Sequence, residues 1–199
     1  MEYRRILERI RTTVRQGSYL VPKPQPRGGQ VEALHEVAAL IAEPDMEPDA
    51  VRVRIHQLHA AGRLDRVMLL SALGVLAASP AVRDYAEAAR LAGQQELVAL
   101  EAGGPHVEAH RASADRHRGV LAYLLGRYEV ALDWFARALE REATAENLGN
   151  VMSAMIRLGE LQEARALQRR VSTWFPTEVA AELQQRIAVD DDLVRLRSA

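Results

Sequence analysis

Four glycines recur along the chain at nearly constant intervals and constrain its fold more than any other feature. Gly62, Gly93, Gly126 and Gly159 are separated by 31, 33 and 33 residues, and each follows one helix-favouring run and precedes another. Ala, Leu, Glu, Arg and Gln dominate residues 30–190, where hardly any stretch alternates apolar and polar side chains as a strand does. This period predicts stacked helix pairs. We therefore expect an all-α fold in which each glycine marks the turn within an antiparallel pair.

The clearest unit of this period lies at residues 112–142, around Gly126. After this glycine, apolar side chains recur at i, i+3, i+4 and i+7, which places them on one face of a helix. These residues are Tyr128, Ala131, Leu132, Phe135, Ala138 and Leu139. Glycine suits the turn because, without a Cβ, it readily adopts the left-handed backbone of a helix C-terminus. Two antiparallel helices joined at Gly126 can then bury this face together.

This unit resembles the tetratricopeptide repeat, whose pattern places glycines, small residues and aromatic residues at fixed positions. The matching residues are Gly119, Gly126, Tyr128, Ala131, Phe135 and Ala138. A weaker copy follows, which retains Gly159, Leu161, Ala164, Val171 and Pro176. In that copy Met152 replaces a glycine and Gln168 replaces an aromatic residue. The resemblance is clearest over residues 112–178, and it implies a right-handed superhelical stack of antiparallel helix pairs, an α-solenoid.

The sequence divides into four segments. Residues 1–29 combine a basic N-terminal helix, expected over residues 1–16, with a linker rich in proline and glycine. Residues 30–104 are expected to form divergent helical hairpins, and residues 105–178 contain the two repeats that resemble the tetratricopeptide pattern. Residues 179–199 supply the rest of a capping helix, expected over residues 177–189, and a tail. A cap is needed because the last repeat of a solenoid otherwise exposes an apolar face.

Charge is distributed unevenly along a chain that is nearly neutral overall. The 26 basic and 27 acidic side chains give a net charge of −1, but residues 1–29 carry +5 and the remainder carries −6. Arg4, Arg5 and Arg9 belong to this basic arm and are candidates for contact with nucleic-acid phosphates. We favour a solvated arm, or one that docks on the protein, because few aromatic residues are interleaved for base stacking.

Residues 48–64 give a second hint of nucleic-acid binding. They resemble the recognition helix of winged-helix regulators, which implies that Arg52 and Arg54 face a DNA groove. Residues 43–47, however, leave no room for the helix that should come before, and no hairpin wing follows Leu64. The alternative function is therefore a DNA-associated transcriptional regulator with a repeat domain for interaction or dimerisation.

Side-chain chemistry does not favour an enzyme. The chain has no cysteine, which excludes disulfides, thiolate metal sites and cysteine nucleophiles. No catalytic or phosphate-binding motif is present. His106, His110 and His117 can share one helix face, but no fourth metal ligand completes the set, which favours a solvated face. We expect neither a metal nor another cofactor.

The leading function is recognition of another protein. In the family that the chain resembles, the first helix of each repeat lines a groove that takes a peptide or a helix. The corresponding residues here are Arg116, Val120, Tyr123, Leu124, Ser153, Ile156 and Arg157. They favour an apolar or mixed ligand such as an amphipathic helix. The alternative is that they pack against the chain's own N-terminal arm or against a second copy in a homo-oligomer.

No segment predicts membrane insertion. The longest nearly apolar run, at residues 67–78, has twelve residues, whereas a membrane helix needs about 20. The first residues also lack the apolar stretch of a secretory signal. We therefore expect a cytoplasmic adaptor or scaffold that binds a protein or peptide partner.

Overall fold

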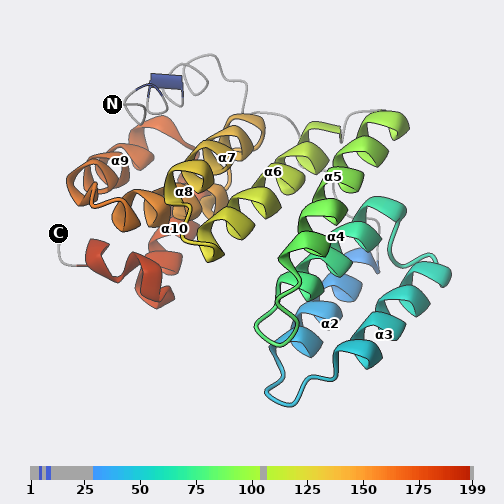
Figure 1. The fold of residues 1–199 in the computed structure, drawn as a ribbon. Coiled ribbons are helices and arrows are strands. Elements are labelled where there is room, and N and C mark those ends of the chain that lie inside the picture. Colours follow the sequence, from blue (N-terminus) through green and yellow to red (C-terminus); the bar gives the residue numbers. More distant parts are fainter. Residues whose placement is uncertain (1–4, 6–7, 10–28, 104–106, 198–199) are drawn as a thin grey trace. The chain divides into compact units, whose positions relative to one another are not determined.

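The computed structural model describes residues 5, 8–9, 29–103 and 107–197. Throughout these residues the regular structure is helical, without a strand, as the sequence predicts (Figure 1). The chain separates into two compact units, Pro22–His117 and Arg118–Ala199, the second of which includes Met1–Val21. Most of the helix expected over residues 1–16 and of the linker after it lies outside the described residues. Each unit is considered on its own below.

In the Pro22–His117 unit, each of the helices from α2 to α5 packs against the next along the chain. The elements of this unit are α2 (Gln30–Ala42), α3 (Pro48–Ala60), α4 (Arg66–Ala78), α5 (Tyr85–Ala102) and the first part of α6 (Val107–Leu124). Contacts join α2 to α3, α3 to α4, and α4 to α5. Ile55, Leu58 and Leu76 are among the most buried side chains of the core that α2, α3 and α4 share.

Two glycines of this unit have different roles. Gly62 has φ 69° and follows α3, as predicted, and the main-chain N of Arg63 donates to O of Leu58 at 2.9 Å to close the turn. Gly93 lies inside α5, so the prediction of a helix pair centred on it is wrong. The turn between α4 and α5 instead ends at Asp84, whose side chain accepts a hydrogen bond from the main-chain N of Glu87. This cap satisfies a donor at the start of α5, and the helix then continues through Gly93.

The Arg118–Ala199 unit contains the two predicted repeats and the cap. Its elements are the end of α6, α7 (Tyr128–Arg141), α8 (Ala145–Arg157), α9 (Leu161–Trp174), α10 (Thr177–Val189) and the 3-10 helix η1 (Asp191–Leu196). Helix α7 packs on α8, and α8 packs on both α9 and α10. These helices therefore pack in neighbouring pairs, and α10 has the bounds predicted for the cap.

The turns of this unit form at the predicted glycines. Gly126 has φ 72° and Gly159 has φ 85°, which is the left-handed region that glycine tolerates. Main-chain N of Arg127 donates to O of Ala122 at 2.8 Å, and N of Glu160 donates to O of Met155 at 2.9 Å. Such hydrogen bonds satisfy carbonyls at the C-terminal end of a helix, which have no partner within it. The local chemistry of glycine thus sets where α6 and α8 end.

A third glycine allows α6 and α7 to approach closely. Gly119 faces Phe135, and a Cβ built at position 119 would lie 2.5 Å from Cε1 of the phenylalanine ring. Phe135 is 2% exposed, while Ala131 and Ala138 on the same helix are fully buried. Small residues thus bring the helices together around one large ring, which explains the glycine, alanine and aromatic pattern in physical terms.

The C-terminal segment is more than a polar tail. Leu193 and Leu196 of η1 are buried in the same core as α7, α8 and α9, in spite of the acidic run Asp190–Asp192 just before them. Asp190 caps the 3-10 helix by accepting a hydrogen bond from the main-chain N of Asp192 at 2.9 Å. Helix η1 contacts α8, α9 and α10.

Candidate partner-binding site

Two residues predicted for the binding groove come together in the structure. Tyr123 near the end of α6 and Arg157 at the end of α8 are 34 residues apart, and Nε of Arg157 donates to the Tyr123 hydroxyl at 2.9 Å. Nη2 of the same guanidinium donates to Oδ1 of Asp192 on η1 at 2.7 Å. One arginine therefore joins side chains from three elements.

The Tyr123 ring is held by its neighbours in sequence and in space. Its centroid lies 5.2 Å from that of Tyr128 in an edge-on arrangement and 6.5 Å from that of Phe135. Edge-on aromatic pairs are favourable because the positive edge of one ring meets the negative face of the other. The ring is thus fixed between α6 and α7, and its hydroxyl lies beside Arg157.

Charge and burial keep the Tyr123 hydroxyl protonated. The pKa of Tyr123 is raised to about 12, mainly by burial; the hydrogen bond from Arg157 opposes this shift and the nearby Asp192 carboxylate adds to it. The same hydrogen bond, followed by that to Asp192, raises the pKa of Arg157 above its ordinary value. At neutral pH the pair is a neutral phenol beside a guanidinium cation. This pair can bind a ligand through hydrogen bonds, but the phenol is not poised to act as a base.

The part of the predicted groove on α8 is covered by the chain itself. Ser153 is 7% exposed and Ile156 is 6% exposed, so neither belongs to an open surface. A Cβ at Gly149, on the same helix, would lie 3.6 Å from Cδ1 of Leu193. Helix η1 therefore packs where the sequence analysis expected a partner. Its leucines could have signalled this, but the preceding acidic residues made the segment look like a solvated tail.

The predicted residues that remain accessible lie around Tyr123. Leu124 is 49% exposed, Val120 is partly buried against the core, and Arg157 is exposed. We call Val120, Tyr123, Leu124 and Arg157 the Tyr123 surface. Arg116 is also on α6, but it belongs to the Pro22–His117 unit and is not part of this surface.

The candidate nucleic-acid contacts in the basic arm differ in whether they are paired with carboxylates. Arg9 pairs with Glu140 at 2.8 Å and with Asp133 at 3.4 Å, both on α7, and the Glu140 hydrogen bond is the main reason that its pKa is raised. Arg5 is exposed, and Arg4 lies outside the described residues. At Arg9, the basic arm thus contacts two carboxylates of α7.

On α3, one of the two candidate arginines is engaged by a carboxylate. Arg54 pairs with Glu36 of α2 at 2.5 Å, and Arg63 pairs with the same carboxylate at 3.2 Å. The Arg54 hydrogen bond is the main reason that the pKa of Glu36 is lowered. Arg52 is exposed. Because Arg54 is already paired with a carboxylate of its own unit, it is less available to bind a phosphate.

The histidines provide no metal site within the described part of the chain. No group of three potential ligands gathers among those residues, and His106 lies outside them. Nδ1 of His117 lies 3.2 Å from Oε1 of Gln95 on α5. Burial, followed by the charge of Arg116, lowers the pKa of His117 to about 4. The neutral imidazole donates a hydrogen bond to the side-chain amide oxygen of Gln95. His117 is therefore a structural residue of its unit.

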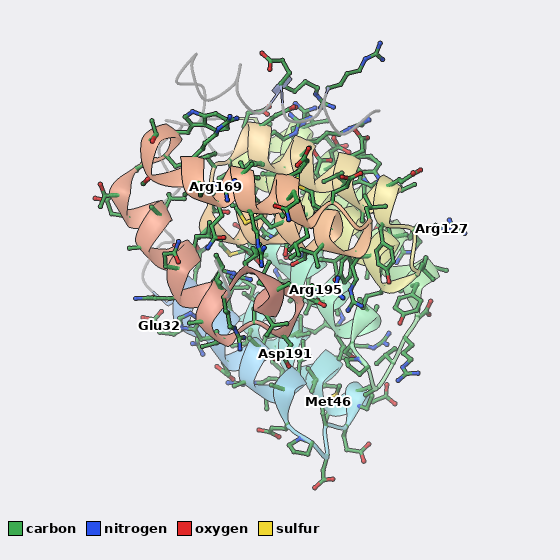
Figure 2. The ribbon with its side chains drawn as sticks, turned by 90° about the vertical axis from the view of Figure 1, so that its left-hand side faces the viewer. Glu32, Met46, Arg127, Arg169, Asp191 and Arg195 are labelled. Carbon is green, nitrogen blue, oxygen red and sulfur yellow. The ribbon has the colours of Figure 1, made fainter. Side chains whose placement is uncertain are left out.

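A groove that the sequence analysis missed lies between α9 and α10, and we call it the α9–α10 groove. It encloses about 800 Å³. Helix α9 contributes Arg165, Gln168, Arg169 and Ser172, and α10 contributes Thr177, Ala180, Ala181 and Gln184 (Arg169 is labelled in Figure 2). The sequence signal was a set of polar residues on α9 that recur at i, i+3, i+4 and i+7 and so share one face of the helix. That pattern also describes an ordinary solvated face.

Comparisons with known proteins identify no relative of this chain. No protein-family model, curated protein or solved structure matches it. Within the described residues, no helix combines the length and the apolar character needed to cross a bilayer.

Proposed function

We propose that this chain is a non-enzymatic, cytoplasmic interaction module that binds a helix or peptide of a partner protein through the Tyr123 surface. In this proposal the helix pairs form a right-handed superhelical stack like that of tetratricopeptide repeats. The observation that carries the proposal is the cluster of Tyr123, Arg157 and Asp192, which presents a fixed phenol and guanidinium beside the exposed Leu124.

The composition of this surface matches that of protein interfaces. Tyrosine and arginine are enriched among the residues that dominate binding energy, since each combines a large apolar body with hydrogen-bond donors. Leu124 and Val120 add an apolar stripe on one side of α6. An amphipathic helix offers the complementary arrangement, with apolar side chains for the stripe and polar side chains that can hydrogen-bond to the Tyr123 hydroxyl and the Arg157 guanidinium.

The polar side chains of the Tyr123 surface are pre-organised. Arg157 is held by both Tyr123 and Asp192, and the Tyr123 ring is held by Tyr128 and Phe135. Fixed side chains lose little rotamer entropy when a partner binds, so more of the contact energy appears as affinity. A solvated arginine at a helix end would not have this advantage.

A quantitative capture experiment tests the proposal. The tagged full-length chain and two variants, Leu124→Asp and Val53→Asp, are used as baits in the same lysate. Val53 is the matched control because it is 56% exposed on α3, in the other unit, and receives the same charge. We expect one or a few proteins to be lost with Leu124→Asp and retained with Val53→Asp. Equal recovery with all three baits, at unchanged helicity by circular dichroism, would contradict the proposed surface.

A further inference from the structure

The α9–α10 groove is basic. Arg165 and Arg169 line it at positions i and i+4 of α9, and none of its described lining residues carries a carboxylate. Like charges at this spacing repel each other on a helix. Within the described residues, no ion pair neutralises either guanidinium. The groove therefore favours an anionic occupant.

The walls of the groove also hold a donor and an acceptor without partners. Nη2 of Arg165 donates to the main-chain O of Arg195 at 3.1 Å (Arg195 is labelled in Figure 2). In contrast, Nε of Arg165 and Oε1 of Gln168 are buried and hydrogen-bond to no described residue. Buried polar atoms are normally paired. The side chains of Arg165 and Gln168 are therefore not fully satisfied within their own unit.

The chain carries an acidic segment of this kind in its other unit. Residues 43–49 read Glu-Pro-Asp-Met-Glu-Pro-Asp, and the four carboxylate side chains are exposed. Among the residues that the structure describes, none forms an ion pair with these carboxylates. We call residues 43–49 the acidic turn.

The acidic turn is presented in a restricted conformation. Main-chain N of Met46 donates to O of Glu43 at 3.2 Å, and the Met46 side chain packs against the core of its unit (Met46 is labelled in Figure 2). Pro44 and Pro48 further limit the backbone. A segment that is already restricted loses less conformational entropy on binding.

We propose that the α9–α10 groove of one copy binds the acidic turn of a second copy. The carboxylates of the turn pair with Arg165 and Arg169. Ala180 and Ala181 form an apolar wall against which Pro44 and Pro48 of the turn can pack. The chain's basic residues 1–29 carry the wrong sign of charge for this groove. Since each copy offers both surfaces, the contact is heterologous and joins copies head to tail.

Sedimentation velocity of the full-length chain tests this proposal. Because the contact is small and charged, we expect the weight-average mass to rise above 22.1 kDa as the concentration increases toward about 1 mM, the range of weak complexes. Screening shortens from about 10 Å at 0.1 M salt to about 3 Å at 1 M salt. The association should therefore be detectable at the lower salt concentration and lost at the higher one.

A charge-swap experiment identifies the two surfaces. The groove variant Arg165→Glu/Arg169→Glu and the turn variant Glu43→Arg/Asp45→Arg should each remain monomeric. An equimolar mixture should associate again, because the natural groove of the turn variant meets the natural turn of the groove variant and the two reversed surfaces meet each other. The control Arg127→Glu/Arg137→Glu also reverses two positive charges, but outside the groove, and should associate like the natural chain. Circular dichroism verifies the fold, and the single variant Arg169→Glu, at an exposed position, replaces the double variant if helicity falls.

Two results would overturn the proposal. The first is a natural chain that remains monomeric at low salt up to the highest concentration. The second is association that persists in the groove variant, which would place the contact on another surface. Leu124→Asp should leave this self-association unchanged, so the outcome is separate from that of the Tyr123 surface.

Discussion

The close approach of α6 and α7 at Gly119 allows a quantitative test of how this fold is built. In an ordinary helix interior, replacement of glycine by alanine stabilises by about 1 kcal/mol. At position 119, however, the new methyl group would lie 2.5 Å from the ring of Phe135, which is itself 2% exposed. Overpacking of a core costs about 1–3 kcal/mol, and this overlap is severe. We therefore expect Gly119→Ala to lower the free energy of unfolding by about 2 kcal/mol net.

A second glycine provides the matched control. Gly74 lies within α4, and a Cβ there would meet Cβ of Leu91 at 3.8 Å, an ordinary contact. Gly74→Ala should therefore raise the free energy of unfolding by up to about 1 kcal/mol. Urea unfolding followed by circular dichroism measures both changes, and Phe135→Leu should reduce the penalty of Gly119→Ala in a double-mutant cycle. Stabilisation by Gly119→Ala equal to that by Gly74→Ala would refute the close-packing argument.

Three further predictions concern the C-terminal segment, a histidine and the basic arm. Leu193→Ala should destabilise the protein by about 2–4 kcal/mol in urea unfolding because it removes a fully buried side chain; an effect no larger than that of Val194→Ala, at a 44% exposed position, would contradict the docking of η1. The pKa of His117 falls from 6.5 to about 4 on folding, so between these pH values the unfolded chain binds more protons. The natural chain should therefore lose up to about 3 kcal/mol more than His117→Gln as the pH is lowered from 6.5 to 4, measured as the difference between their unfolding free energies. Arg9→Ala removes exposed ion pairs with Asp133 and Glu140, so it should lower the unfolding free energy by at most about 1 kcal/mol at low salt and by less at high salt.

Local sequence signals predicted the helices and two of the turns in the Arg118–Ala199 unit. Gly126 and Gly159 could be located because a left-handed helix end strongly favours glycine, whatever surrounds it. Gly93 shows the limit of the same argument, since glycine is also tolerated inside a helix. The capping pair Asp84 and Glu87 indicates the start of α5 more directly than the spacing of the glycines does.

The candidate site was only partly predictable because it depends on contacts between distant residues. Periodicity placed Tyr123 and Arg157 on their helices, but their hydrogen bond and the role of Asp192 depend on how α6, α8 and η1 pack. Likewise, an acidic run preceding Leu193 looks solvated in sequence, whereas the structure buries the leucine on α8. Local sequence patterns predict the helices. Which side chains cover or complete a surface depends on how those helices pack.

Site-specific photo-crosslinking tests the proposed Tyr123 surface most directly. A photoreactive amino acid is placed at position 124, or at the exposed control position 53, and the cells are irradiated before lysis. The proposed function predicts a discrete crosslinked product with another protein from position 124, absent from position 53 and lost when Arg157→Glu is added. Crosslinking patterns that are the same at both positions, or a product that survives Arg157→Glu, would contradict it.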